Sequence, residues 1–322
     1  MSPPARLLSL ALLLPLAGCG RIVVTAQDCI VGPDGRAELT AFVEREPFQG
    51  IRRSVNTARV DFTLDGRPVG TVTTTGDGRA VLTVDLPPGV ADFDVRARYK
   101  GHDLRDRGRA FRWDPTRTAV AVDIDDTLSH TDYAVLLFRE EDDRSDPLRG
   151  SRAAMNTLAL DFHIVYLTGR TRFLADKTRH WLESRGYPPG PIVTAPRIRD
   201  TILQPFFKRQ ALTELRARWP NLLIGIGDRW VDTFAYEPNG LLTLLVDGDD
   251  ETTPDRAVFR FARWRRIAEF CRLNRSMLNP ADVLHTALDA RANFLLPPPD
   301  PAPKSANSLA APTLGSDDDA DD

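Results

Sequence analysis

The pattern of apolar residues changes at Trp113-Asp114-Pro115, and this change limits the architectures that the chain can adopt. Before it, short stretches alternate apolar and polar side chains between turns rich in Gly and Pro. After it, continuous apolar runs alternate with segments of helical periodicity. Alternation predicts strands with one solvated face, whereas continuous runs predict strands buried on both faces, as in parallel sheets covered by helices. The 322 residues are enough for about two domains, so we expect an all-β module followed by an α/β module.

Composition excludes several classes of protein. Hydrophobic residues make up 42% of the chain and charged residues 27%, as in soluble globular proteins. The net charge of -3 excludes a broad basic field, so nucleic acid is not an expected partner. Three cysteines are too few for a disulfide scaffold or a structural zinc site. Cys29 and Cys271 are interpreted as buried free thiols, and a disulfide formed after export is the alternative.

The first residues resemble a bacterial lipoprotein signal peptide, which we expect to cover 1–19. The apolar run Leu7–Leu16 is too short to span a membrane. It ends in Leu16-Ala17-Gly18-Cys19, which resembles the lipobox, whose cysteine receives a diacylglyceryl group. Plain signal-peptidase cleavage is the alternative. The resemblance implies a lipid anchor on Cys19 and a place in the bacterial cell envelope, facing the periplasm. Gly20 favours the outer membrane, because an Asp there retains such proteins at the inner one.

Residues 22–113 predict a small all-β sandwich of the immunoglobulin-like kind. Val60, Phe62 and Leu64 alternate with polar neighbours, and Asp65-Gly66 marks a turn. Similar alternation returns over 93–99, and Gly and Pro separate the runs. No catalytic set of residues stands out in this module. We therefore expect it to act as a spacer or binding module between the anchor and the rest of the chain.

Residues 118–275 predict a three-layer α/β domain with a central parallel sheet. The apolar runs expected as strands are Ala119–Val122, His163–Leu167, Pro191–Val193, Leu222–Ile226 and Leu242–Val246. Helical spacing of apolar residues predicts helices over 173–184 and 205–219. A third, basic and aromatic helix is expected over 255–274, at the end of the domain. It either packs on the domain with a solvated Arg face or faces a membrane or a phosphate group.

The last segment, 297–322, is rich in Pro and ends in acidic residues. It has few groups worth burying, so we expect it to be a disordered tail.

Three carboxylates follow the first of these apolar runs directly. The sequence there is Asp123-Ile124-Asp125-Asp126-Thr127. Like charges this close repel, so a cation is expected among them. Ligands bind at the carboxyl ends of strands in open α/β sheets, and Mg²⁺ favours carboxylate and phosphate oxygens. The segment therefore predicts a magnesium site.

Three further clusters lie at the positions where the same site would need them. Thr168-Gly169-Arg170 ends the second apolar run, where a hydroxyl and an amide are placed to bind phosphate oxygens. Lys208 lies in the first turn of a predicted helix, where a cation is unfavourable unless it faces an anion. Gly227-Asp228-Arg229 ends the fourth run, and Asp232 follows it. Asp228 is expected to complete the metal site from the opposite side.

The four clusters together resemble the motifs of the haloacid dehalogenase (HAD) superfamily of phosphohydrolases, over about residues 118 to 247. The segments VDIDDTLSHTD, YLTGRTRFLADKTRHWLESRGYPPGPIV and IGIGDRWVDTFAY resemble more closely the catalytic domain shared by lipins and the actin-patch-associated phosphatidate phosphatases. The resemblance implies a HAD-like Rossmannoid fold. One departure is Asp228, where lipins usually carry Asn. The other is the all-β module, which is not the obvious lipin partner domain.

The resemblance also implies a role for each site residue. Asp123 would attack phosphorus, Asp125 would act as general acid and base, and Asp123, the Asp125 carbonyl and Asp228 would bind Mg²⁺. Thr168, the Gly169 amide and Lys208 would bind the phosphate group. Asp232 would orient Lys208 or a metal-bound water, and Thr127 would brace the loop. Arg170 and Arg229 are expected either to contact a second anionic group of the substrate or to form structural ion pairs.

Three functions stay open at this point. The first is a membrane-tethered phosphatidate phosphatase that releases diacylglycerol and phosphate; an expected minimal cap, with about thirty residues over 129–158, favours such an open site. The second is the same chemistry on a soluble periplasmic phosphomonoester or a phosphoprotein. The third is a lipid-binding lipoprotein without catalysis. The sequence does not determine the oligomeric state.

Overall fold

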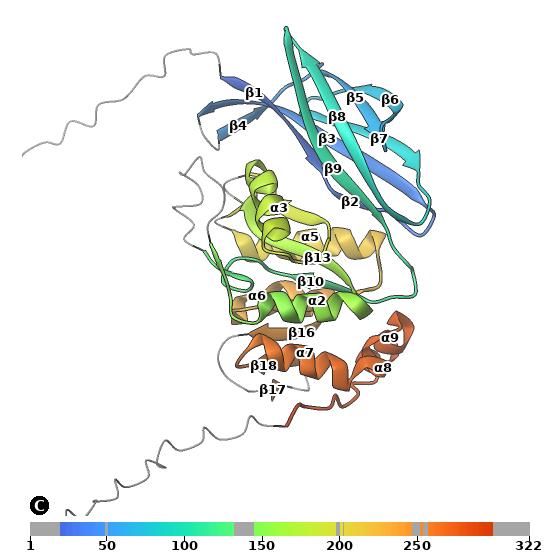
Figure 1. Ribbon diagram of the computed structural model, residues 1–322, viewed down its shortest axis with the longest axis vertical. Coiled ribbons are helices and arrows are strands. Elements are labelled where there is room, and N and C mark those ends of the chain that lie inside the picture. Colours follow the sequence, from blue (N-terminus) through green and yellow to red (C-terminus); the bar gives the residue numbers. More distant parts are fainter. Residues whose placement is uncertain are drawn as a thin grey trace, which may run out of the picture.

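The computed structural model of the protein describes residues 20–48, 51–131, 145–197, 200–201, 203–246, 252–253 and 257–298 (Figure 1). The expected signal peptide with Cys19 lies outside these residues. So does the expected acidic tail, apart from Pro297 and Pro298. The expected minimal cap falls partly outside them as well.

The first part of the chain forms two sheets that share one core. One sheet holds β1 (Arg21–Gln27), β3 (Arg36–Phe48), β4 (Ile51–Ser54) and β7 (Arg79–Asp85). The other runs in the order β2 (Cys29–Ile30), β9 (His102–Arg112), β8 (Gly89–Tyr99), β5 (Arg59–Leu64) and β6 (Arg67–Thr73). All these pairs are antiparallel except β2 with β9. Alternate residues such as Leu39, Phe62 and Phe93 face the shared core, as the period of two along a strand requires.

The rest of the chain is built around one larger sheet. Its strand order is β14 (Ile192–Ala195), β13 (His163–Thr171), β10 (Ala119–Val122), β15 (Leu222–Gly227), β16 (Leu242–Val246), β18 (Val258–Phe261) and β17 (Thr252–Thr253). Neighbouring strands from β14 through β13, β10, β15 and β16 to β18 pair parallel. Strand β17 pairs antiparallel with β18 at the edge of the sheet.

Helices cover both faces of this sheet, which explains the continuous apolar runs. Val120 and Val122 pack with one group of helices, α2 (Ser151–Asp161), α3 (Ala175–Ser184), α7 (Trp264–Leu273) and α9 (Ala281–Asp289). Ala119 and Ala121 point to the opposite face and pack with α5 (Gln204–Arg218) and α6 (Trp230–Tyr236). A strand in this position has no solvated face, so every residue of β10 is buried. A short helix, α8 (Arg275–Leu278), joins α7 to α9.

The predicted fold class, a HAD-like Rossmannoid three-layer α/β domain preceded by a small all-β sandwich, is wrong for this protein. Strand residues (42%) exceed helix residues (29%), and much of the strand content lies in antiparallel sheets. The prediction took its fold class from the five apolar runs after residue 118 and from the resemblance of the residues that follow them. The strands before that point are longer, since β3 alone has 13 residues, and they pair antiparallel. The chain therefore combines antiparallel sheets with one mainly parallel sheet and its helices.

The helix expected over 255–274 is also corrected. Val258–Phe261 is strand β18, and the helix α7 begins only at Trp264. Within β18, Arg260 is only half-buried among three buried apolar residues, a pattern that suits a strand. In α7, Trp264, Ile267, Phe270 and Cys271 are buried against the sheet. Cys29 and Cys271 are both buried free thiols in different cores.

Asp28 links the first two sheets to the part of the chain around the large sheet through hydrogen bonds and an ion pair. Its buried carboxylate accepts hydrogen bonds from both terminal nitrogens of Arg179 on α3, each at 3.0 Å. It also accepts from the backbone N–H groups of Arg109 (2.8 Å) and Ile192 (3.1 Å). Four donors from three elements satisfy the carboxylate completely. A buried bidentate pair of this kind fixes geometry as well as distance.

We predict that Asp28→Ala destabilises the protein by about 3–5 kcal/mol, because it leaves the Arg179 guanidinium buried without its partner. Chemical unfolding measured by circular dichroism tests this. Asp94→Ala is the matched control, because Asp94 pairs with Arg107 at the surface and such pairs contribute little. Equal stability of the two variants would contradict the role given to Asp28.

Candidate active site

Three neighbouring strand ends bring the predicted clusters to one edge of the large sheet. The order β13-β10-β15 places residues 168–170, 123–127 and 227–228 side by side, because parallel strands end at the same edge. The N–H of Asp123 donates to the Ile226 carbonyl at 3.0 Å. Asp126 adopts a φ of 60°, an unusual conformation for a residue other than Gly, and the chain turns there. The Thr127 hydroxyl then donates to Asp228 Oδ1 at 3.0 Å, which is the bracing contact expected of it.

Lys208 is the centre of the first ionic group. Its Nζ lies 2.9 Å from Asp123 Oδ2 and 2.8 Å from Asp232 Oδ1, and all three side chains are buried. Burial alone would lower the pKa of Lys208, but the two carboxylates raise it above its ordinary value. The ammonium therefore stays charged near the start of α5, at the end where the helix dipole disfavours a cation. The carboxylates supply the anionic environment that this placement requires.

Asp123, Asp228 and Asp232 form a group of three carboxylates. One oxygen of each lies within 4.8 Å of the others. Burial raises the pKa of Asp123 above its ordinary value, and the neighbouring Asp232 and Asp125 raise it further, against the effect of Lys208. Burial and the Asp232 charge raise the pKa of Asp228 to about 6. Lys208 and Arg229, whose Nε is 3.4 Å from Asp228, do not balance the three negative charges in such a buried place.

The donor atoms of this group fit a hard divalent cation. Asp123 Oδ2 is buried, and no described residue donates a well-aligned hydrogen bond to it, although Lys208 lies 2.9 Å away. Asp232 is held by the buried Lys208 ammonium on Oδ1 and by the Arg229 N–H at 3.3 Å on Oδ2. The cation beside Asp228 is instead the half-exposed Arg229 side chain. Asp123 and Asp228 are therefore the carboxylates best placed to hold Mg²⁺, which takes few carboxylates and completes its shell with water and phosphate oxygens.

Asp125 belongs to a second ionic group. Arg170 Nε donates to Asp125 Oδ1 at 2.9 Å, and its Nη2 lies 2.8 Å from the same oxygen. The Thr168 hydroxyl donates to Asp125 Oδ2 at 3.0 Å. Burial raises the pKa of Asp125, but Arg170 and the hydrogen bonds outweigh it and lower the pKa below its ordinary value. The carboxylate is therefore ionised and lies outside the group of three, and the expected role of its carbonyl toward a metal stays a prediction.

Arg170 and Gly169 both make close contacts with residues from other segments of the chain. Arg170 is completely buried against Asp125, which matches the structural ion pair that was one of its two expected roles. A Cβ on Gly169 would lie 2.4 Å from the Gln204 side chain at the start of α5, so a larger residue would require that side chain to move. The spacing of residues along the chain predicts neither contact, because Asp125 and Gln204 lie in segments distant from Gly169 and Arg170.

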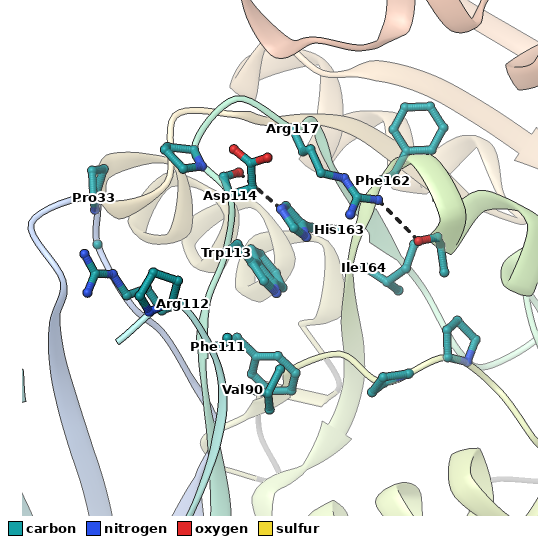
Figure 2. A pocket seen from close by; sticks show the side chains of 17 residues that line it. Pro33, Val90, Phe111, Arg112, Trp113, Asp114, Arg117, Phe162, His163 and Ile164 are labelled. Atoms are coloured by element: carbon teal, nitrogen blue, oxygen red, sulfur yellow. Dashed lines mark hydrogen bonds between the residues drawn. The ribbon is translucent and has the colours of Figure 1, made fainter. Parts of the chain in front are cut away.

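The two large cavities lie away from these carboxylates. Figure 2 shows one of about 640 Å³ beside the stacked rings of Trp113 and His163. His163 is the first residue of β13, so this cavity lies at the opposite end of the strand from Thr168. The other, of about 1180 Å³, lies between β3 and β4 on one side and α5 on the other. Neither is lined by Asp123, Asp228 or Lys208.

Comparison with known proteins adds no family. No family model matches the chain, and no curated protein matches it. Among solved structures, it is similar to the fibronectin(III)-like modules of Clostridium thermocellum CbhA (17% identity, 29% of this chain and 98% of that chain, TM-score 0.20). It is also similar to the PKD domain of human KIAA0319 (19% identity, 29% and 81%, TM-score 0.20).

A third structure, the endo-beta-1,4-mannanase of Thermotoga petrophila, shares 11% identity over 30% of this chain and 21% of that chain, with a TM-score of 0.22. The chain thus spans about a fifth of the length of that enzyme. Likenesses this low carry no argument about function. None of these neighbours is related to the haloacid dehalogenases.

We predict that Mg²⁺ raises the melting temperature of the protein and that Asp228→Ala removes most of this rise. A ligand that binds only the folded state stabilises it by about 2.7 kcal/mol at a hundred times its Kd. Thermal unfolding with Mg²⁺ and with a chelator measures the effect without any assay of activity. Asp94→Ala, at an exposed carboxylate elsewhere, should respond as the wild type does. An equal rise in Asp228→Ala would exclude this metal site.

Proposed function

We propose that the protein is a Mg²⁺-dependent phosphomonoester hydrolase that works through an aspartyl-phosphate intermediate. The observation that carries the proposal is the contact of Lys208 with both Asp123 and Asp232 beside Asp228. A buried nucleophile, a fixed cation and a group of carboxylates at one sheet edge are the parts that phosphoryl transfer needs. The resemblance of the four clusters to the phosphohydrolase motifs supports the same chemistry.

In this proposal the Asp123 carboxylate attacks phosphorus in line with the leaving oxygen. The bond from phosphorus to the alkoxide breaks, and an aspartyl phosphate forms on Asp123. Lys208 stays beside the carboxylate and stabilises negative charge on the transferring group. Asp123 and Asp228 would hold Mg²⁺, which when bound offsets the charge of the phosphate oxygens. Water then attacks the intermediate and restores the carboxylate.

Asp125 is the proposed general acid and base, and its surroundings limit when it plays each role. Ionised and held by Arg170 and Thr168, it is in the form that accepts a proton from the attacking water. To protonate the leaving alkoxide, the carboxyl must first gain a proton and turn from Arg170. Hydrogen bonds of catalytic groups often rearrange when substrate binds. The second half of the reaction therefore matches the described geometry better than the first.

Phosphatidate is the proposed substrate, with diacylglycerol and phosphate as products. Support comes from the resemblance to lipins and from the lipid anchor expected on Cys19, which would keep enzyme and substrate in one plane. Within the described ranges, none of the helices combines the length and apolar character that a membrane-spanning segment needs. The place in the outer membrane, facing the periplasm, stays a prediction.

We predict that Asp123→Asn folds and binds Mg²⁺ weakly but releases no measurable phosphate. Removing the nucleophile removes covalent catalysis, and uncatalysed monoester hydrolysis is extremely slow, with enzymatic accelerations of up to ~10²¹. Phosphate release from phosphatidate in mixed micelles, with and without Mg²⁺, is the measurement. The same assay with sugar phosphates, nucleotides and p-nitrophenyl phosphate separates a lipid substrate from a soluble one. Activity of Asp123→Asn above a few per cent of wild type would remove the proposed nucleophile.

Asp125→Asn is expected to retain phosphatidate binding and lose turnover by about 10²–10⁴-fold, the usual contribution of acid–base catalysis. It should also accumulate the phosphorylated enzyme, because hydrolysis of the intermediate needs the base. Acid quenching after labelled substrate measures that species. Unchanged turnover would contradict the role, and binding without Mg²⁺-dependent release in the wild type would favour a lipid-binding lipoprotein.

A further inference from the structure

Four large apolar side chains are exposed on or beside the two helices that carry Lys208 and Asp232. They are Leu203 (53% exposed), Phe206 (62%), Trp230 (50%) and Phe234 (40%), which we call the aromatic rim. Leu203 precedes α5, Phe206 lies in its first turn, and Trp230 and Phe234 lie on α6. Single exposed apolar residues are common, but several together mark a surface that another molecule covers.

The aromatic rim is one surface, and it belongs to the two helices that carry the catalytic group. The rings of Phe206 and Phe234 pack edge to face with centroids 5.3 Å apart, so α5 and α6 contact each other through these side chains. Trp230 and Phe234 are four residues apart on α6 and so lie on the same face. Lys208 is the fifth residue of α5 and Asp232 the third of α6, each two residues after a rim residue, so they come from the same two helices as the rim but from other faces of them. The rim and the residues that would handle phosphate therefore lie at the starts of the same two helices.

Two exposed arginines accompany the rim. The Arg209 guanidinium lies 5.5 Å from the centre of the Phe234 ring. Arg229 directly precedes Trp230 and contacts Asp228 with its Nε at 3.4 Å. Aromatic rings with neighbouring cations suit the interface of an anionic bilayer, where rings lie at the headgroup level and each cation adds electrostatic attraction.

The start of the described chain lies at the same end of the protein as the carboxyl ends of the strands. Arg52 of β4 donates to Thr25 of β1 at 3.0 Å and lies over the Phe173 ring at 5.6 Å. Phe173 closely follows the carboxyl end of β13. In Figure 1 the start of β1 and helix α6 both lie on the left of the view, with β1 near the top and α6 in the lower half. An anchor just before Gly20 would therefore leave the protein on the side where the rim is.

We propose that the aromatic rim docks the protein on an anionic phospholipid bilayer and brings the mouth of the active site to the headgroup level. The inference deepens the proposed function and rests on it for the lipid substrate. The rim inserts into the outer part of the acyl layer, and Arg209 and Arg229 contact lipid phosphates. The lipid anchor keeps the protein at the membrane, whereas the rim sets its orientation.

Trp230 is a built-in reporter for the test. Of the five tryptophans, Trp181, Trp219 and Trp264 are buried and Trp113 stacks on His163. The chain from Gly20 onward contains both modules with their cores, so it is suitable without the preceding residues. It is mixed with vesicles of phosphatidylcholine and phosphatidylglycerol whose phosphatidylcholine carries brominated acyl chains. We expect these vesicles to quench the tryptophan fluorescence, and Trp230→Phe to lose the quenching while it still sediments with vesicles.

Binding is measured by sedimentation with the same vesicles. The double variant Phe206→Ser/Phe234→Ser should bind vesicles at least about tenfold more weakly than the wild type, because two aromatic side chains no longer move from water into the bilayer. Leu160→Ser is the matched control: Leu160 is 77% exposed, and its carbonyl accepts from Arg117 near the amino end of β10. It should bind as the wild type does. Vesicles of phosphatidylcholine alone should bind more weakly than the mixed vesicles.

Several results would overturn the proposal. Equal quenching in wild type and Trp230→Phe would show that the rim does not enter the bilayer, even if the double variant failed to fold. A wild-type dimer that the double variant converts to a monomer, with vesicle binding unchanged, would show that the rim pairs two copies of the chain. The two proposals are tested separately. Asp123→Asn should insert as the wild type does, because it changes only the proposed nucleophile. Wild-type protein that inserts but releases no phosphate from any substrate would refute only the hydrolase, and wild-type protein that releases phosphate from micelles but does not insert would refute only the docking.

Discussion

The structure at the candidate site depends on one buried ammonium group. Lys208 lies between Asp123 at the end of β10 and Asp232 on α6, and so joins a strand, the helix that carries it and a second helix. Without it, two buried carboxylates would lose their partner, which costs far more than the pair itself contributes. Gly227 allows the same closeness, because a Cβ there would lie 2.5 Å from an Asp232 oxygen. Ion pairing and close packing thus both hold α6 in its position beside the strand ends.

The acidic residues divide into two ionic groups with different proton affinities. Arg170 and Thr168 hold Asp125 ionised, whereas burial and like charges raise the pKa of Asp123 and Asp228. Carboxyl groups in environments that separate their pKa values are the usual basis for dividing acid, base and nucleophile roles. The division follows from topology, because Arg170 comes from β13 on one side of β10 and Asp228 from β15 on the other.

The sequence predicted single strands better than the fold class. Ala119–Val122 was predicted as a strand and is one, because a run buried on both faces leaves few alternatives. The fold class was wrong because it was named from the α/β part of the chain, whereas strands, many of them antiparallel, outnumber helices in the structure. The helix over 255–274 was wrong because apolar residues in β18 also fit helical spacing. The Asp125–Arg170 pair and the exposure of Phe206 depend on how distant segments meet, and spacing along the chain carries no signal for either.

Charge also explains why a cation and a phosphate group would bind together. The three carboxylates and Lys208 carry a formal charge of about minus two, so a phosphate dianion approaching Asp123 alone would be repelled. A divalent cation on Asp123 and Asp228 brings this group to about neutral, and the burial that weakens solvent screening then strengthens attraction between cation and phosphate. Because the Asp125 pair is already neutral with Arg170, the cation changes the charge of only one group. In the proposed reaction, the carboxylate of Asp123 would therefore be the group most affected by a metal, while Asp125 would keep its own ionisation.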